Sequence, residues 1–519
     1  MKVIRKSIVP LLLFILVFAA ELPSISYWAV QYHYVVPDAL SRVSNAFTVM
    51  YSRDPHLAAI GFVWNPLPSL LELVPLLFWP WWPELAADGV SGMLLTALFA
   101  GAGALLLYRT FRASGVSRAF TGLWVLCFAF HPFIYMYGAN GMSEGFFTYF
   151  LLLSVVGVGA WFHENNMKSI LGLGLGLACC FLIRYEAVPL AAAVAAAVLL
   201  GSLKRSDPLR KNYLRMEGTA ILTLTPFVYA VVLWLWFNFA IQGNAFYFLN
   251  SNYSNIGQSV NLSDYFSELQ TNKWEILYFI TERSLPFLPP LGVILLFRLL
   301  TRRLFSREVL ALLLMVVSVP VLQFYLLNKG NSYGWLRFFY YPFPIAVAWA
   351  GFEWSWLGKK WRPWFGAVLT LSIVVSGVSV YNYMNVPRLS PEEHAMLHFQ
   401  ENDLYKEMSL SRAISADLSS RLAKEPKSLV LLDSYGTAEI LTTIRYPKQL
   451  VITSDRDFLA FIEDPAKADY ILVPRNEGKS RQNELNVRFP QLFANGMEGW
   501  KLERDYDQQW RLYKKTSAN

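Results

Sequence analysis

Apolar runs of about twenty residues recur along the first three quarters of the chain, separated by short polar or charged stretches. A helix that crosses a membrane needs about 20 largely apolar residues, so each run predicts one span. The predicted spans are residues 8–29, 89–108, 119–137, 144–162, 169–183, 187–203, 218–241, 286–300, 308–327, 335–352 and 362–384. The pattern therefore predicts a polytopic α-helical membrane protein with eleven spans, in a transmembrane domain of residues 1–387.

Two apolar segments need separate interpretation. Residues 8–29 have the length of a signal peptide, but Phe18 stands where a cleavage site needs a small residue, which favours an uncleaved first helix. Residues 65–83 are apolar yet rich in proline and tryptophan, which favours an interfacial segment over a straight span. Together with the helix expected from residue 38, this segment predicts outer juxtamembrane helices at residues 38–83.

The tail, residues 388–519, has no span and a different pattern. Short apolar runs at 429–432, 450–453 and 470–473 predict strands, and helical patterns at 436–443, 455–463 and 480–492 separate or follow them. Residues 500–504 and 509–514 predict a hairpin. We expect a soluble α/β domain with a partly parallel sheet. It would serve acceptor recognition or regulation, or act as a folding or assembly module.

Composition and charge placement support this division. Hydrophobic residues make up 55% of the 519 residues and charged residues 16%, against about 25% charged in soluble domains. This composition excludes an ordinary cytosolic protein, a disordered chain and a nucleic-acid binder. The net charge of +8 reflects basic loops, because lysine and arginine mark the cytoplasmic side of membrane proteins. The basic clusters lie at residues 109–118, 168, 204–215, 298–307 and 359–362.

This bias predicts a multi-pass protein of the inner or plasma membrane, with a cytoplasmic N-terminus and an extracytoplasmic C-terminus. The three cysteines, Cys127, Cys179 and Cys180, lie within apolar runs and imply neither a disulfide framework nor a thiolate metal site.

Candidate chemistry begins just after the first span, at Pro37-Asp38. From there apolar residues recur at helical spacing, and Asp38 and Arg42 fall on the polar face, which predicts an amphipathic helix on the outer membrane surface. In one interpretation Asp38 caps this helix and pairs with Arg42. In the other, Asp38 lies at the mouth of a membrane cavity and accepts a proton from a hydroxyl group.

Three further charged residues stand at outer ends of predicted spans. Glu144 follows a short outer loop, where it could simply begin a helix or could belong to a site. Arg184 and Arg337 could reach to the interface as anchors, or bind the oxygens of a phosphate with their planar forks. Arg337 lies among aromatic residues, including Tyr341, that suit the apolar start of a polyprenyl chain.

These residues occur in an order that resembles the C-type glycosyltransferase superfamily, in particular its bacterial branch similar to protein O-mannosyltransferases and lipid A aminoarabinose transferases. The resemblance covers roughly residues 8–350. An acidic motif follows the first span, here Pro37-Asp38 with Arg42. Later segments resemble a Pro-Pro-Leu motif, a Met-Pro-Glu motif and an Arg-Tyr-x-x-Pro motif, here Asn65-Pro66-Leu67-Pro68, Met142-Ser143-Glu144 and Arg337-Phe338-Phe339-Tyr340-Tyr341-Pro342. Family members often have two adjacent acids at the first motif, whereas Ala39 follows Asp38 here.

The resemblance implies a C-type glycosyltransferase fold and a hexosyl- or pentosyltransferase that moves a sugar from a polyprenyl-phosphate donor. The acceptor would be a hydroxyl of a glycan, lipid or protein at the outer face. By resemblance, Asp38 would be the general base in an inverting reaction. Glu144 would orient the acceptor or help to hold a divalent ion. Some relatives require a divalent metal and others do not; the sequence contains no closed ligand set, so no metal ligands are assigned and the cofactor stays open.

The competing interpretation is a lipid-linked glycan flippase or transporter, which would share the basic inner loops and the intramembrane charges. No inverted repeat or matching pair of broken helices supports it. A polymerase or ligase of lipid-linked glycans is a third class, chemically closer to the first.

Overall fold

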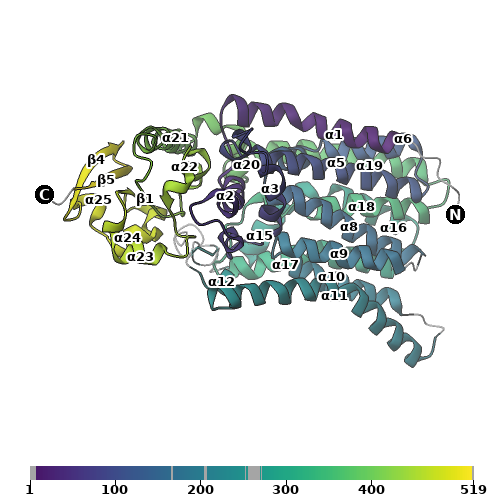
Figure 1. Ribbon diagram of the computed structural model, residues 1–519. Helices are drawn as coiled ribbons and strands as arrows, with labels where there is room; N and C mark the ends of the chain where they lie inside the picture. The colour runs from purple at the N-terminus through teal and green to yellow at the C-terminus, as the bar shows by residue number, and fades with distance from the viewer. Residues whose placement is uncertain are drawn as a thin grey trace. The chain divides into compact units, whose positions relative to one another are not determined.

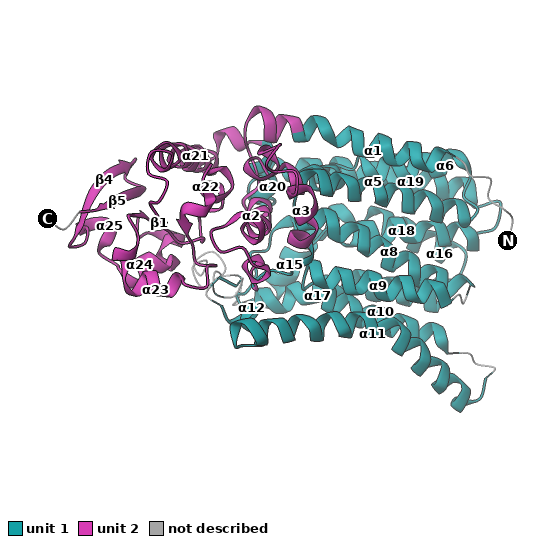
Figure 2. Cartoon of the chain, viewed as in Figure 1, with its two compact units in different colours: residues 1–25, 63–67, 93–397 teal, residues 26–62, 68–92, 398–519 magenta. Residues whose placement is uncertain are grey.

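The computed structural model describes residues 8–164, 167–203, 207–251, 253–254, 257, 269 and 272–516. Lys204, Arg205 and the basic residues before the first span, which entered the charge argument, lie outside these residues. The chain forms two compact units (Figure 2). The helical unit comprises Met1–Ile25, Val63–Leu67 and Met93–Leu397, and the sheet unit comprises Ser26–Phe62, Pro68–Gly92 and His398–Asn519. Compact units need not be separately folding domains, so the expected boundary at 387/388 stays a prediction.

The helical unit is built from long apolar helices that run side by side (Figure 1). Six helices in the described residues are long and apolar enough to cross a membrane, and up to eight if each of two bent pairs counts as one span. The six are Val9–Gln31 (α1, Val9–Ile25, with its π-helical continuation), α5 (Val90–Ala113), α8 (Ser143–Glu164), α11 (Leu209–Gln242), α17 (Arg307–Asn328) and α19 (Arg362–Met384). The architecture confirms a polytopic membrane protein, while the count of eleven stays a prediction.

The remaining predicted spans differ from straight, full-length helices. The run at 119–137 folds as α6 (Arg118–Ala129) and α7 (Pro132–Ala139), bent by 62°. Proline at the first position of α7 favours a break there, because proline lacks the backbone N–H and its ring crowds the preceding turn. A second bent pair, Lys273–Phe287 with α16 (Pro289–Leu300), turns by 82°. The helices α9 (Met167–Ile183) and α10 (Ala187–Ser202) are short for a span.

The span expected at 335–352 begins later in the structure than the sequence pattern predicted. A 3₁₀ turn at Leu336–Phe338 precedes α18 (Pro342–Trp356), in which proline again occupies the first turn. The aromatic segment before Pro342 therefore has an irregular backbone and lies at one end of the helical unit. Arg337 is buried in this segment.

The basic connections of the helical unit meet at one end, which we call the basic end. Arg307, at the start of α17, donates to the Leu203 carbonyl after α10. The Trp354 indole near the end of α18 donates to the Gly115 carbonyl after α5, at 3.0 Å. Arg303, between α16 and α17, donates to the Trp356 carbonyl, so the ends of α10 and α18, the residue Gly115 after α5 and the α16–α17 connection lie together, as the charge pattern predicted for one side of a membrane.

In the sheet unit, five strands form one sheet in the order β2-β1-β3-β5-β4. The strands β1 (Val430–Leu431), β2 (Leu450–Val451) and β3 (Tyr470–Pro474) are parallel, whereas β4 (Trp500–Tyr506) and β5 (Trp510–Lys515) form an antiparallel hairpin. The helices α22 (Ala438–Thr443) and α23 (Phe458–Glu463) lie where helical patterns were predicted. The predicted partly parallel α/β sheet is therefore confirmed.

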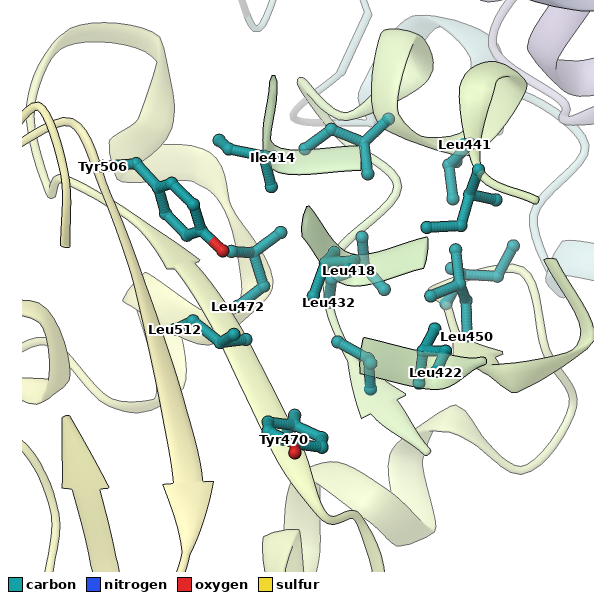
Figure 3. Close-up of a cluster of buried hydrophobic side chains, with 14 residues drawn as sticks. Ile414, Leu418, Leu422, Leu432, Leu441, Leu450, Tyr470, Leu472, Tyr506 and Leu512 are labelled. Carbon is teal, nitrogen blue, oxygen red and sulfur yellow. The ribbon is translucent and has the colours of Figure 1, made fainter. Parts of the chain in front are cut away.

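One core of the sheet unit packs α21 (Asp403–Leu422) against the sheet. The helix α21 contributes Ile414, Leu418 and Leu422, each at most 1% exposed, and these pack with Leu432, which follows β1, and with Leu472 of β3 (Figure 3). Apolar residues at helical spacing on α21 explain why it covers the sheet. Shorter helices, including α20 (Pro391–Leu397), α24 (Glu484–Arg488) and α25 (Leu492–Asn495), complete the chain after the last span.

The helix that carries Asp38, α2 (Pro37–Tyr51), belongs to the sheet unit and is more buried than the sequence predicted. Its apolar side is covered, as expected, but Arg42, Ser44 and Thr48 on other sides are also buried. The reason is that α22, α4 (Glu84–Ala87) and the 3₁₀ turn Leu57–Ile60 all pack on it. Of the predicted polar face, Arg42 is buried, whereas Asp38, Ser41 and Asn45 stay partly exposed, so the amphipathic pattern holds except at Arg42.

Candidate functional site

Glu144 lies at the start of α8, where the backbone leaves little freedom. Asn140 closes an Asx turn by accepting from the Met142 amide at 3.0 Å, and Gly141 takes a positive φ of 76°. A Cβ at Gly145 would lie 2.5 Å from the Tyr137 carbonyl, so only glycine lets α8 begin this close to α7. These constraints hold Glu144 fully buried, at 0% exposure, at the end of the helical unit opposite the basic end.

The Glu144 carboxylate is the centre of an alternating series of charges. Its Oε1 atom forms an ion pair with Nη1 of Arg184 and lies 3.4 Å from Nη1 of Arg337. Nη2 of Arg184 forms a second ion pair with Oε1 of Glu186 at 2.5 Å, and Nε of Arg337 lies 2.9 Å from Oε2 of Glu392. The order Glu186–Arg184–Glu144–Arg337–Glu392, which we call the ion chain, places two guanidinium groups around one buried carboxylate.

Burial makes the ion chain energetically significant. The side chains of Arg184 and Arg337 are 9% and 5% exposed, so neither is an interfacial anchor that reaches solvent. Burial alone would raise the pKa of Glu186, but the Arg184 charge outweighs it and holds that pKa below its usual value. Buried charges of this kind are stable only when they are paired.

Aromatic rings and one tyrosine hydroxyl complete the surroundings of the arginines. The guanidinium of Arg337 lies 4.4 Å from the ring centroid of Trp335, and that of Arg184 lies 5.6 Å from Phe338. Tyr341 is fully buried and acts electrostatically on Arg184. In the part of the chain that the structure describes, the Tyr341 hydroxyl and Nε of Arg184 are buried without a hydrogen-bond partner.

A second buried carboxyl group lies beside the ion chain. Glu393 accepts from the Tyr137 hydroxyl at 2.8 Å and from the Ser390 hydroxyl at 2.7 Å. Burial raises the pKa of Glu393, although both hydrogen bonds and the charge of Arg337 oppose that shift. Glu393 therefore fixes the segment that presents the neighbouring Glu392 to Arg337.

Asp38 and Arg42 are placed by the sheet unit. Val36 is the N-cap residue of α2, without a side-chain cap, and Asp38 follows Pro37 in the first turn, partly buried. The interpretation of Asp38 as the N-cap is therefore wrong. The positive charge of Arg42 acts on Glu72 of α3 (Leu67–Leu76), whose carboxyl is fully buried. Burial dominates over this charge and holds the pKa of Glu72 well above its usual value.

The tail holds the end of α2 through ion pairs within the sheet unit. Arg53 donates to Asp455 at 3.1 Å and also pairs with Asp457, while Asp54 accepts from Nε of Arg456 at 2.9 Å. We call this set of paired charged residues the α2 clip; its members are Arg53, Asp54, Asp455, Arg456 and Asp457. Through the clip and the packing of α22, the tail positions the helix that carries Asp38, a role that the sequence pattern did not predict.

Another ion pair of the sheet unit contains a carboxyl group with a shifted pKa. Glu439 on α22 is 6% exposed and pairs with Arg412, which also binds Asp88 at 2.8 Å. Burial raises the pKa of Glu439 to about 7, although the Arg412 charge opposes the shift. The stability of the α22 region should therefore depend on pH near neutrality.

The structure thus brings together four of the six predicted residues, Glu144, Arg184, Arg337 and Tyr341, in the helical unit. The partners Glu186 and Glu392 were missed. Glu186 stands two residues after Arg184 and could have been noticed as a charge in the same short connection; no local pattern marks Glu392. Among the described residues, no group of three or more histidine, cysteine, aspartate or glutamate side chains could hold a metal ion.

Part of the chain matches a known sequence family. Residues 84–241 match the sequence family described as dolichyl-phosphate-mannose-protein mannosyltransferase. The matched segment contains Glu144, Arg184 and Glu186 of the ion chain, whereas Asp38, Arg337 and Glu392 lie outside it. No curated protein matches the chain. The family match confirms the resemblance to the protein O-mannosyltransferase branch of the C-type superfamily and indicates a membrane glycosyltransferase that uses a lipid-linked sugar.

Proposed function

We propose that this protein transfers a sugar from a polyprenyl-phosphate donor to an acceptor hydroxyl at the outer face of the membrane, with inversion at the anomeric carbon. The transferred sugar is a hexose or a pentose, and the acceptor is a glycan, a lipid or a protein. The ion chain lies at the end opposite the basic loops, which the positive-inside rule assigns to the cytoplasm. That placement supports an extracytoplasmic site.

One observation carries the proposal: Nε of Arg184 and the Tyr341 hydroxyl are buried donors without an acceptor among the described residues. Buried donors are nearly always satisfied in folded proteins, so such a pair points to a missing acceptor. A phosphate group supplies several acceptor oxygens and negative charge. The neighbouring Trp335 and Phe338 suit the apolar chain that the phosphate would carry.

The charge balance of the ion chain defines how phosphate would bind. Two arginines face three carboxylates, so the resting cluster has an excess of one negative charge when all are ionised. A phosphate bound at the two unpaired donors, Nε of Arg184 and the Tyr341 hydroxyl, adds to this negative charge, so its binding depends on the nearby guanidinium charges. Glu144 then acts by holding both guanidinium groups in position. Its expected role, to orient the acceptor or help to hold a divalent ion, stays a prediction.

The chemistry follows from these assignments. Asp38 takes the proton of the acceptor hydroxyl as that oxygen attacks the anomeric carbon. The bond between the sugar and the phosphate oxygen breaks, and polyprenyl phosphate leaves with its electron pair. The leaving phosphate gains negative charge in the transition state, so Arg184 and Arg337 stabilise the transition state more than the bound donor.

Purified protein in liposomes that contain a radiolabelled polyprenyl-phosphate sugar tests the proposal. A glycosyltransferase consumes the labelled donor and transfers the label to an acceptor. A flippase moves the intact donor between leaflets without consuming it, and that outcome would refute the proposal.

A further inference from the structure

The basic end of the helical unit contains a cavity of about 250 Å³. It lies between the α16–α17 connection, which contributes Arg303, and the end of α18 with the start of α19, which contribute Trp356 and Trp361. Arg298 and Glu353 form its inner wall. The reaction assigned to the opposite end uses none of these residues.

The acid in the cavity wall does not repel an anion. Glu353 receives Nε and Nη2 of Arg298 at 2.7 and 2.8 Å, and the Trp349 indole donates to it at 2.9 Å. Both groups of this bidentate pair are buried. A carboxylate that accepts three hydrogen bonds, two from one guanidinium, is neutralised by the protein itself.

Arg303 provides the free binding capacity of the cavity. Its side chain is exposed, and the only side-chain hydrogen bond of Arg303 among the described residues runs from Nη1 to the Trp356 carbonyl at 3.3 Å. A guanidinium has five N–H donors, so most of those on Arg303 remain available to a ligand. The planar fork matches the oxygens of a phosphate.

The surroundings favour an anion at the membrane interface. Residues 298–308 and 353–362 contain seven basic and two acidic residues, and the two acids are Glu308 and Glu353. Trp356 and Trp361 are half-buried, and tryptophan is typical of the headgroup level of a bilayer. The cavity is smaller than a typical site of about 300–1,000 Å³ for a drug-sized ligand, which suits a phosphate-bearing headgroup.

We propose that this cavity binds the phosphate group of an anionic phospholipid headgroup at the cytoplasmic side, with Arg303 as its main ligand. Basic pockets between helices on the cytoplasmic side are known to take anionic headgroups. A soluble phosphate offers the same chemistry, so the experiment separates the two sources. The proposal does not depend on the reaction assigned to the outer end.

The test uses purified full-length protein in a neutral detergent. Binding of dioleoylphosphatidylglycerol, dioleoylphosphatidylcholine and inorganic phosphate is measured by native mass spectrometry and by thermal stabilisation. We expect phosphatidylglycerol to bind in preference to phosphatidylcholine. Arg303→Gln should weaken its binding by roughly tenfold, as expected for a lost hydrogen bond to a charged group. Arg303→Lys should retain part of the affinity.

Arg210→Gln is the matched control, because Arg210 is an exposed arginine in the first turn of α11 at the same end of the unit. It should bind phosphatidylglycerol like the wild type. Displacement of the lipid by millimolar inorganic phosphate would overturn the lipid assignment in favour of a soluble phosphate; failure to displace it would support the lipid as the ligand. Unchanged lipid binding in Arg303→Gln, or an equal loss in Arg210→Gln, would overturn the proposal.

Discussion

Replacing Glu144 by glutamine tests the ion chain most sharply, because the change keeps the size of the side chain and removes only its charge. Glu144 is fully buried, and the two arginines on its Oε1 atom are at most 9% exposed. Breaking a buried ion pair costs about 3–5 kcal/mol. Arg184 and Arg337 keep Glu186 and Glu392, so we expect the low end, about 3 kcal/mol.

The loss can be measured as the free energy of unfolding in mixtures of sodium dodecyl sulfate and a mild detergent. A double-mutant cycle with Arg337→Gln isolates the pair. Each single variant leaves a buried charge poorly compensated, whereas the double variant removes both charges, so we expect a coupling of about 1–3 kcal/mol. Turnover of Glu144→Gln should fall by roughly tenfold or more, because a mispositioned guanidinium binds the developing charge poorly.

Glu282→Gln is the matched control. Glu282 also receives two arginines, Arg388 at 2.9 Å and Arg283 at 3.5 Å, but Arg388 is 64% exposed. The control should lose less than about 1 kcal/mol and keep its turnover. If Glu144→Gln were no more destabilising than Glu282→Gln, and its coupling to Arg337 were zero, the ion chain would not hold the site together.

Four further changes have defined outcomes. Asp38→Asn should lower turnover by roughly 10²-fold or more while donor affinity is kept, and near wild-type kinetics would exclude a general base there. Arg337→Lys should reduce turnover because a lysine lacks the planar fork, whereas Arg337→Ala should weaken donor binding as well; full tolerance of lysine would end the phosphate assignment. Arg53→Ala opens the α2 clip and should lower turnover without weakening donor binding, and an unchanged rate would show that the clip is dispensable. Finally, the native state binds the Glu439 proton more tightly than the unfolded state between about pH 4.5 and 7, so the stability of the α22 region should fall as pH rises through that window. The total change should be at most about 3 kcal/mol. The stability of the α22 region is measured by hydrogen exchange, corrected for the intrinsic pH dependence of the exchange rate. Glu439→Gln should abolish the pH dependence of this stability; if the dependence persists, another group causes it.

The sequence was most informative where one physical requirement dominates. Apolar runs must become buried or lipid-facing helices, and β-rich runs bounded by turns became β1, β2 and β3 in the predicted parallel arrangement. Charges at predicted helix ends likewise located Glu144, Arg184 and Arg337 at one end of the bundle, because consecutive spans alternate in direction.

The parts that were missed depend on long-range packing. Helical periodicity identified the apolar side of α2, but it could not reveal that α22 of the tail packs on this helix. Arg337 precedes α18 and Glu392 follows α19, so their ion pair joins segments that are separated by two helices in the sequence. No local spacing predicts such a pair. The bend at Pro132 had a visible cause, yet its size of 62° depends on the neighbouring helices.

The central claim is that the protein breaks the bond between a sugar and the phosphate of a lipid donor. Phosphorus-31 nuclear magnetic resonance of purified protein with a polyprenyl-phosphate sugar and an acceptor extract follows that bond directly. The account predicts that the phosphodiester signal of the donor is replaced by the phosphomonoester signal of free polyprenyl phosphate, more slowly in Arg337→Lys. A phosphodiester signal that persists although the protein binds the donor would contradict it.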